Sequence, residues 1–266
     1  MLSRYSRKLQ GQRVLVLGGT SGIGFCVAQG ALEQGAVVII SGSKQDKIDS
    51  KMRELEASYP EAQGRILGKA CDLANLQSQE GNLVALLDFA TENKTKKLDH
   101  IAYTAGTGVF NPAFSDLTVE MVCDAQRMRV FAPLMLMKHA ETYLNKSPAS
   151  SLTFTSGEGT YRPQPGWTLM IMIGGMFDGL VRSGAVNLAP IRVNCVAPGA
   201  VMTELWGGGQ MPSEEQAKLV ADRVGPKTLT GQIGMPEDVA EAYLYFMKDR
   251  NATGRVHVSE GGSLLK

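Results

Sequence analysis

Hydrophobic residues along the chain follow two alternating periods. Short runs rich in aliphatic and β-branched residues, typical of buried strands, occupy residues 13–17, 37–41, 65–71, 100–104, 152–155, 192–197 and 256–259. Between these runs apolar residues recur every three or four positions, the period of an amphipathic helix, as in Ile23, Val27 and Ala31. Strands that alternate with helices are typical of a parallel sheet covered by helices. The pattern therefore predicts an α/β fold with a doubly wound parallel sheet.

Five helices are expected between the strands. The first ends near Gly35 and the second at Pro60, because both residues stop helices. A third includes residues 83–90, a major helix spans 121–143, and the last spans about 167–188. Neither a repeat nor a linker interrupts the chain, so residues 1–266 are predicted to form a single domain.

Composition removes several classes of partner. The 266 residues carry 27 Lys or Arg and 26 Asp or Glu, a net charge of +1, so no nucleic-acid surface is expected. Apolar stretches such as 130–137 and 169–173 are far shorter than the roughly 20 residues that span a bilayer, and residues 1–8 lack the apolar run of a secretory signal. The four cysteines are scattered, which favours buried thiols in a reducing compartment. We therefore expect a cytoplasmic protein without a metal site or a membrane partner.

A glycine-rich turn follows the first strand and opens the first helix. It comprises Gly18, Gly19, Thr20, Ser21, Gly22, Ile23 and Gly24. Glycines at such a turn allow the backbone to approach a pyrophosphate, and the helix N-terminus offers free N–H donors. A turn with only a packing role is the alternative, but the strand-turn-helix setting favours a dinucleotide site.

Further motifs agree with one family. They are Asp72-Leu73, Tyr103-Thr104-Ala105-Gly106, residues 192–199 with Val201 and Thr203, residues 236–240, and Glu260-Gly261-Gly262. Over nearly its whole length the chain resembles the short-chain dehydrogenase/reductases, which have a Rossmann fold. The resemblance implies that a nicotinamide dinucleotide is held by Gly18, Thr20, Ser21, Gly22, Ile23, Gly24, Asp72, Leu73, Ala105, Gly106, Pro198, Gly199, Val201 and Thr203. In that family the turn at Asp72 holds the adenine, and the loop from Pro198 to Thr203 contacts the nicotinamide.

The end of the second strand indicates which dinucleotide is preferred. An acidic residue there would bond the ribose 2′-hydroxyl of NAD(H). This chain has Gly42 followed by Ser43 and Lys44, so no carboxylate repels a 2′-phosphate and two residues are suited to bind one. The sequence therefore predicts NADP(H), although Lys44 as a solvated surface lysine is the alternative.

The catalytic residues of the family are mostly replaced. Its ordinary members carry Tyr-x-x-x-Lys on the helix before residues 192–197, and the tyrosine protonates the forming alkoxide. Counted back from Arg192, the tyrosine position falls on Met170 and the lysine position on Gly174. The asparagine position holds Arg129, and the serine position keeps Ser156.

Loss of the acid narrows the chemistry. Hydride transfer to a ketone leaves an alkoxide that needs a proton, whereas hydride transfer to an iminium leaves a neutral amine. The sequence therefore favours iminium reduction, or a reaction in which only the shape of the substrate is controlled.

The loop before the helix at 167–188 indicates a substrate pocket. Pro163 and Pro165 restrict Gln164 to an extended conformation, and Trp167 follows at the mouth of the helix. Met170, Met172 and Met176 suit a bulky polycyclic ligand. For Met172 and Met176 packing in the core is the alternative, whereas the position of Met170 is expected to face the nicotinamide.

With Arg129, these features resemble the fungal reductase/Diels-Alderases of prenylated indole alkaloid pathways, which reduce a cyclic iminium with NADPH and then guide an intramolecular cycloaddition. The resemblance implies that Arg129 holds a substrate carbonyl, Trp167 forms an apolar wall, and Gln164 orients a lactam or ring nitrogen. Those relatives place an aspartate where this chain has Gln164, which cannot supply the negative charge.

Two further expectations concern dynamics and assembly. Trp206 and the glycines 207–209 predict a mobile lid around residues 203–230, with a plain surface loop as the alternative. The expected partners are a polycyclic alkaloid substrate and further copies of the chain, as a dimer or tetramer. Two other functions stay open: an isomerase or cyclase that uses the dinucleotide as a scaffold, and a non-catalytic dinucleotide-binding redox sensor.

Overall fold

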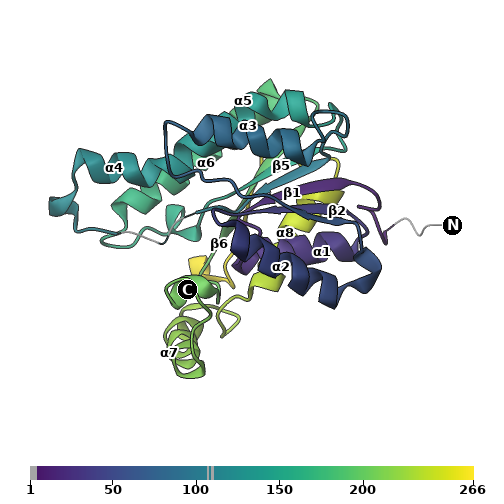
Figure 1. Ribbon diagram of the computed structural model, residues 1–266. Coiled ribbons are helices and arrows are strands. Elements are labelled where there is room, and N and C mark those ends of the chain that lie inside the picture. Colours follow the sequence, from purple (N-terminus) through teal and green to yellow (C-terminus); the bar gives the residue numbers. More distant parts are fainter. Residues whose placement is uncertain (1–4, 107, 109–110) are drawn as a thin grey trace.

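The computed structural model describes residues 5–106, 108 and 111–266, and it is built on one parallel sheet. Seven strands pair in the order β3-β2-β1-β4-β5-β6-β7 (Figure 1). Their bounds are β1 Arg13–Leu17, β2 Val37–Ser41, β3 Ile66–Gly68, β4 His100–Tyr103, β5 Ser151–Thr155, β6 Arg192–Pro198 and β7 Val256–Ser259. The predicted α/β doubly wound sheet is confirmed.

Helices cover both faces of this sheet, as Figure 1 shows. Their bounds are α1 Gly22–Glu33, α2 Gln45–Ser58, α3 Gln79–Ala90, α4 Val119–Gln126, α5 Ala132–Tyr143, α6 Thr168–Asn187, α7 Glu214–Val224 and α8 Pro236–Lys248. Alternate residues of β1 face opposite cores: Val14 and Val16 pack with α1, α2 and α8, whereas Leu15 and Leu17 pack with α3, α5 and α6. Strands buried on both faces explain the continuous apolar runs in the sequence.

The third strand is shorter than expected. The prediction was residues 65–71, but the ladder with β2 ends at Gly68. Beyond it the Lys69 and Cys71 N–H groups still donate to the carbonyls of Ile40 and Gly42, at 3.2 and 2.8 Å. The Ala70 N–H, which alternates with them, donates to the Gln45 side chain at 2.9 Å. The chain therefore follows β2 as far as Cys71, although the regular ladder is shorter than predicted.

The predicted helix over 121–143 is confirmed in its extent but not in its regularity, because the chain is helical from Val119 to Tyr143 in three consecutive segments. The helix begins earlier, at Val119, where the Thr118 side chain accepts a hydrogen bond from the Met121 N–H. It is interrupted by a π-helical segment, Arg127–Phe131, before α5 begins. Pro133 explains the interruption, because in a straight α-helix its ring would collide with the carbonyl of the residue four positions earlier.

The C-terminal helices α7 and α8 were not predicted. Helix α8 starts at Pro236 and packs on α1, where Leu244 comes so close to Gly30 that a Cβ there would lie 2.6 Å from Leu244 Cδ1. Helix α7 stands away from the sheet in Figure 1, and none of its residues is buried. A capping box of Ser213 and Gln216 stabilises its N-terminus instead.

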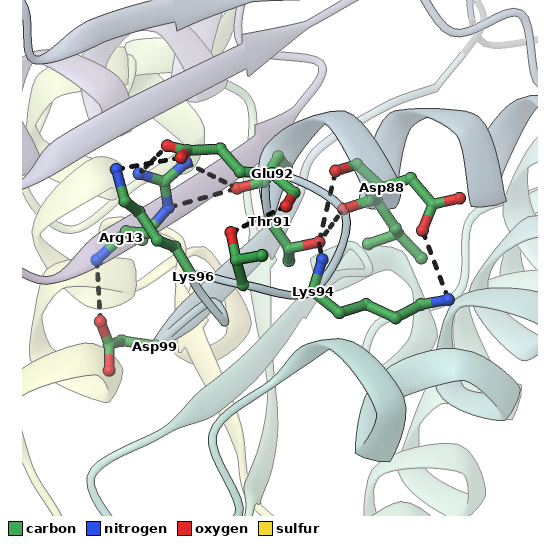
Figure 2. Close-up of polar contacts among 10 residues, drawn as sticks. Arg13, Asp88, Thr91, Glu92, Lys94, Lys96 and Asp99 are labelled. Atoms are coloured by element: carbon green, nitrogen blue, oxygen red, sulfur yellow. Dashed lines mark hydrogen bonds and ion pairs between the residues drawn. The ribbon is translucent and has the colours of Figure 1, made fainter.

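The connection from α3 to β4 is fixed at the amino end of the sheet (Figure 2). The Arg13 backbone N–H donates to Asp99 at 2.8 Å, and its guanidinium donates to the Ala90 carbonyl at 2.8 Å and pairs with Glu92 at 3.5 Å. Lys94 pairs with Asp88 at 3.6 Å. These contacts align β4 with β1, and the carboxyl ends of both strands then meet at the opposite edge.

Helix α6 is longer and more apolar than the sequence analysis expected of any segment in a protein without a membrane partner. By length and composition it is the one helix in the described part of the chain that is apolar enough to cross a bilayer, with 28% of its apolar window buried. Its residues Leu169, Ile173, Phe177 and Val181 are buried. Phe177 and Val181 belong to the core on one side of the sheet, so one face of α6 packs against that core.

All four cysteines are free, as predicted. The expectation that they are buried holds for Cys71 and Cys195 but is wrong for Cys123, which is exposed on α4, a helix without buried residues. Cys26 is half-buried. Among the described residues no group of three or more His, Cys, Asp or Glu side chains is placed to hold a metal ion.

Candidate active site

The glycine turn lies where β1 and β4 end side by side. Here the strand order changes direction, and ligands of open α/β sheets bind in the crevice at such a point. A Cβ at Gly18, which has φ +85°, would lie 2.6 Å from the Ala105 backbone nitrogen, and one at Gly24 would lie 2.3 Å from the Gly18 carbonyl oxygen. Backbone therefore packs on backbone at this turn, and only glycine fits.

The start of α1 is suited to hold a phosphate. Ser21, the residue before the helix, is extended, and its side chain does not cap the first N–H groups. Gly22 has φ +48°, and a Cβ there would lie 3.0 Å from the methyl carbon of Thr203. The helix start, with its free N–H donors and the positive end of the helix dipole, thus lies beside Thr203 of the predicted nicotinamide loop, and it is called the cradle below. These residues fit the diphosphate of a dinucleotide.

The predicted ribose contacts lie beside this cradle. A Cβ at Gly42 would be 3.0 Å from the Thr20 hydroxyl oxygen, so β2 ends against the glycine turn. Ser43 and Lys44 follow and are exposed, and Lys44 precedes the first turn of α2. The structure therefore brings both residues to the same edge as the turn.

The predicted adenine turn is tied to the segment that carries Arg129. Leu73 is buried and its carbonyl accepts from the Gln79 side chain at 2.6 Å. The same amide donates to the Arg127 carbonyl at 2.8 Å. Asp72 lies exposed on the turn, and its carboxylate accepts from the Ala74 N–H at 2.9 Å. A single buried glutamine thus joins two parts of the site.

Arg129 lies in the π-helical segment, half-buried and directly against Gly106. A Cβ at Gly106 would be 3.3 Å from Arg129 Nη2 and 3.4 Å from Cζ, so glycine leaves room for the guanidinium. Burial lowers the pKa of Arg129, and the Tyr103 hydroxyl acts in the opposite direction. An arginine remains protonated in proteins, so the site contains a partly desolvated cation.

The position of the missing lysine is filled by other side chains. A Cβ on Gly174 would lie 2.5 Å from the Thr160 hydroxyl oxygen and 3.3 Å from that of Ser156. The Ser156 hydroxyl donates to the Gly174 carbonyl at 3.0 Å. Met170 is half-buried one turn earlier on α6. A side chain at residue 174 would therefore require the Thr160 hydroxyl to move away.

A carboxylate that the sequence analysis missed lies beside the predicted nicotinamide loop. Glu158 accepts a hydrogen bond from the Ser263 hydroxyl, and a Cβ on Gly199 would lie 3.2 Å from its Oε2 atom. Burial raises the pKa of Glu158 and Glu260 raises it further, while the Ser263 hydrogen bond and Arg162 lower it. Arg162 also donates to the Ser263 carbonyl, so this segment is tied to the C-terminus.

The remaining predicted substrate residues lie on the rim. Gln164 and Trp167 are exposed, and the Trp167 N–H donates to the Gln164 carbonyl at 3.2 Å. Met172 is also exposed, whereas Met176 packs against the core. The Trp206 indole donates to the Val201 carbonyl at 2.8 Å. The first bond fixes the backbone at the start of α6, and the second fixes the Trp206 side chain.

Comparison with known proteins decides the family. Residues 5–266 match the model of an SDR-like Rossmann domain. The chain belongs to the short-chain dehydrogenase/reductase family. Members of this family are oxidoreductases with a fold that binds a nicotinamide dinucleotide, and the cradle above fits that group.

Individual relatives are similar over the whole chain. The short-chain dehydrogenase/reductase ucsE of Acremonium sp is 39% identical over 100% of both chains, and malC of Malbranchea aurantiaca is 39% identical over 99% of each. The solved structure of the MalC reductase/Diels-Alderase from Malbranchea aurantiaca matches with a TM-score of 0.90 at 38% identity, over 99% of this chain and 100% of that one. The two relatives are equally similar to this chain but have different names, so they support membership of the reductase family and do not distinguish between substrates.

Proposed function

We propose that this protein reduces a cyclic iminium with NADPH and then controls an intramolecular Diels-Alder cycloaddition in indole alkaloid biosynthesis. The observation that carries the proposal is a contrast within the site. The glycine turn for the dinucleotide is intact, whereas the lysine position is Gly174, and the Thr160 hydroxyl fills the space beside it. The similarity to the MalC reductase/Diels-Alderase supports the same reaction class.

Tyr103 and Tyr161 are poor substitutes for the catalytic tyrosine that is missing at Met170. The Tyr103 hydroxyl already donates to the Met128 carbonyl, and burial raises its pKa. The Tyr161 hydroxyl donates to Asp178 at 3.1 Å, and burial with that carboxylate raises its pKa to about 12. A general acid works best when its pKa lies near the operating pH. Reduction of an iminium needs none, because the product amine is neutral.

The proposed substrate contacts follow from position and charge. Arg129 donates hydrogen bonds to a substrate carbonyl, since its guanidinium is half-buried and lies at Gly106. Trp167 covers an apolar face of a polycyclic substrate, and Gln164 orients a lactam or ring nitrogen. Ser156 holds the loop after β5 against α6 through its bond to Gly174, and it can orient a carbonyl only by releasing that bond.

NADPH is the proposed cofactor, and it supplies the hydride when bound. The residues assigned above to the glycine turn hold its diphosphate, while Ser43 and Lys44 bind the 2′-phosphate. No carboxylate stands at Gly42 to repel that phosphate. The segment 203–230 is the proposed lid, and helix α7, which buries none of its residues, is its mobile part.

Product analysis with labelled cofactor tests this function. The protein is incubated with NADPH that carries deuterium at C4 of the nicotinamide and with a prenylated, tryptophan-derived cyclic iminium. Deuterium at the former iminium carbon and one stereoisomer of the cycloadduct are expected. Cycloadduct without NADPH oxidation would replace the proposal with a scaffold cyclase, and binding of NADPH without any product would indicate a non-catalytic protein.

A further inference from the structure

The π-helical segment leaves the Met128 carbonyl without a donor from residues 132 and 133 of its own helix. In a helix the Met128 carbonyl would accept from residue 132 or, in the π register, from residue 133. The Ala132 N–H donates to the Arg127 carbonyl, and residue 133 is proline, which has no N–H. Buried carbonyls are almost always hydrogen-bonded, so this one needs a donor from elsewhere in the fold.

The Tyr103 hydroxyl is that donor. It lies 2.5 Å from the Met128 carbonyl oxygen, and Tyr103 is only 2% exposed. Arg129 is the next residue in the chain, and its guanidinium packs on Gly106, three residues after Tyr103. We propose that Tyr103 is a positioning residue, whose hydroxyl fixes the π-helical segment so that Arg129 faces the substrate.

Tyr103 is itself held rigidly enough to serve this purpose. It is the last residue of β4, in the middle of the sheet, and its carbonyl accepts from the Thr155 hydroxyl at 2.7 Å. Its ring contacts Phe154 with the centroids 6.1 Å apart. The sheet therefore fixes the Tyr103 side chain, and the Tyr103 hydroxyl in turn fixes the backbone next to Arg129.

Gln79 donates to the Arg127 carbonyl, which precedes that of Met128, but it connects this segment to a different part of the site. Its side chain joins Arg127 to Leu73, on the adenine side of the site. Of these two side chains, only Tyr103 donates to the carbonyl of Met128, the residue directly before Arg129. Loss of its hydroxyl should therefore affect the substrate more than the dinucleotide.

The role of Tyr103 in substrate binding rests on the proposed function of Arg129, whereas its role in placing Arg129 does not. Tyr103→Phe keeps the ring and removes the hydroxyl, and Tyr243→Phe is the matched control. Tyr243 is also fully buried, but its hydroxyl pairs with Thr155 at 2.6 Å and not with the π-helical segment. The single Thr155 hydroxyl hydrogen is donated to the Tyr103 carbonyl, so this bond can persist when the Tyr243 hydroxyl is removed. Both variants lose one buried hydroxyl group, so a general loss of stability appears in both.

Crystal structures of the two variants test placement without any substrate. In Tyr103→Phe the Met128 carbonyl should turn away and the guanidinium should leave Gly106, whereas Tyr243→Phe should retain both. An unmoved Arg129 in a folded Tyr103→Phe protein would overturn the proposal. This result is independent of whether the protein reduces iminium ions.

A double-mutant cycle tests the consequence for binding. With NADPH and the prenylated, tryptophan-derived cyclic iminium, Tyr103→Phe should raise KM roughly 10-fold or more, because small misplacements of a binding group are costly. In an Arg129→Ala background the same substitution should change KM no further, since its effect passes through that arginine. Equal effects in both backgrounds would overturn the positioning role. No turnover by the unsubstituted protein would contradict the proposed function alone, and the crystal structures would still decide the placement of Arg129.

Discussion

The dinucleotide half of the site and the proton-transfer half differ in what holds them together. At the glycine turn, backbone atoms of Gly18 and Gly24 pack on each other and on β4, so few substitutions are tolerated. At α6 the chemistry of related enzymes depends on two side chains, and Thr160 occupies the space beside Gly174. Cofactor binding that depends on backbone geometry can therefore persist while proton transfer, which depends on side chains, is lost.

Substitution in the dinucleotide half should have the largest effect. In Gly24→Ala the new methyl group would lie 2.3 Å from the Gly18 carbonyl oxygen, so α1 has to shift away from the turn. We expect NADPH affinity to fall by about 10²-fold, as overpacking of a rigid contact predicts. Calorimetric titration measures this loss.

Gly81→Ala is the matched control for that experiment. Gly81 lies in α3, and a Cβ there has nothing within 4 Å. Affinity should be unchanged and the melting temperature slightly raised, because alanine favours helix over glycine. Equal NADPH affinity in both variants would mean that the turn does not carry the dinucleotide.

The choice of dinucleotide should depend on one exposed cation. Lys44→Ala is expected to weaken NADPH binding about 10-fold, since one charge-assisted hydrogen bond to the 2′-phosphate is lost. NADH, which lacks this phosphate, should bind the variant as it binds the unsubstituted protein. Titration of both cofactors against both proteins measures the difference, and a parallel loss for NADH would remove Lys44 from the phosphate site.

A carboxylate on the substrate rim should improve the reduction of a cation. Gln164→Asp is expected to increase the rate of iminium reduction by about 2- to 5-fold, a modest gain because water screens a charge at this exposed position. Single-turnover NADPH oxidation measures the rate, and Gln164→Asn controls for the shorter side chain. An equal rate in the two variants would show that residue 164 lies outside the reach of the reacting cation.

The thermal stability of the protein should depend on the charge of Glu158. Burial raises the pKa of Glu158 above its ordinary value of 4.5, so the folded protein binds the proton more tightly than the unfolded chain does. The ionised carboxylate therefore reduces stability above that raised pKa, and the cost disappears as the pH falls below 4.5. Thermal melts should show Glu158→Gln about 2–4 °C more stable at pH 7 and no more stable at pH 4. A constant difference across that range would assign the effect to packing.

The fold was predictable because its signals are local and regular. Buried strands such as β1 and β2 appear as nearly continuous apolar runs, and the glycine turn marks the first crossover. The C-terminal helices were missed although α8 has Pro236 at its first turn followed by acidic residues, which is a recognisable start signal. Helix α7 was missed although Ser213 and Gln216 have the spacing of a capping box and the apolar residues after them recur at helical spacing, as in Ala217, Val220 and Val224.

The site was less predictable, because its key contacts join residues far apart in the chain. Tyr103 was visible in the sequence as part of a motif, but its bond to Met128 depends on the π register that Pro133 imposes. Proline inside a predicted helix was the available signal. Glu158 and Thr160 carried none, since only the fold brings them to Gly199 and Gly174.

The central claim is that this site transfers hydride without a general acid. Single-turnover NADPH oxidation by the unsubstituted protein, with a prenylated cyclic iminium in parallel with a panel of simple ketones, tests it most directly. Oxidation is predicted with the iminium, and ketone rates should remain at background because a general acid, worth typically about 10²- to 10⁴-fold, is missing at Met170. Ketone turnover as fast as iminium turnover would contradict the claim.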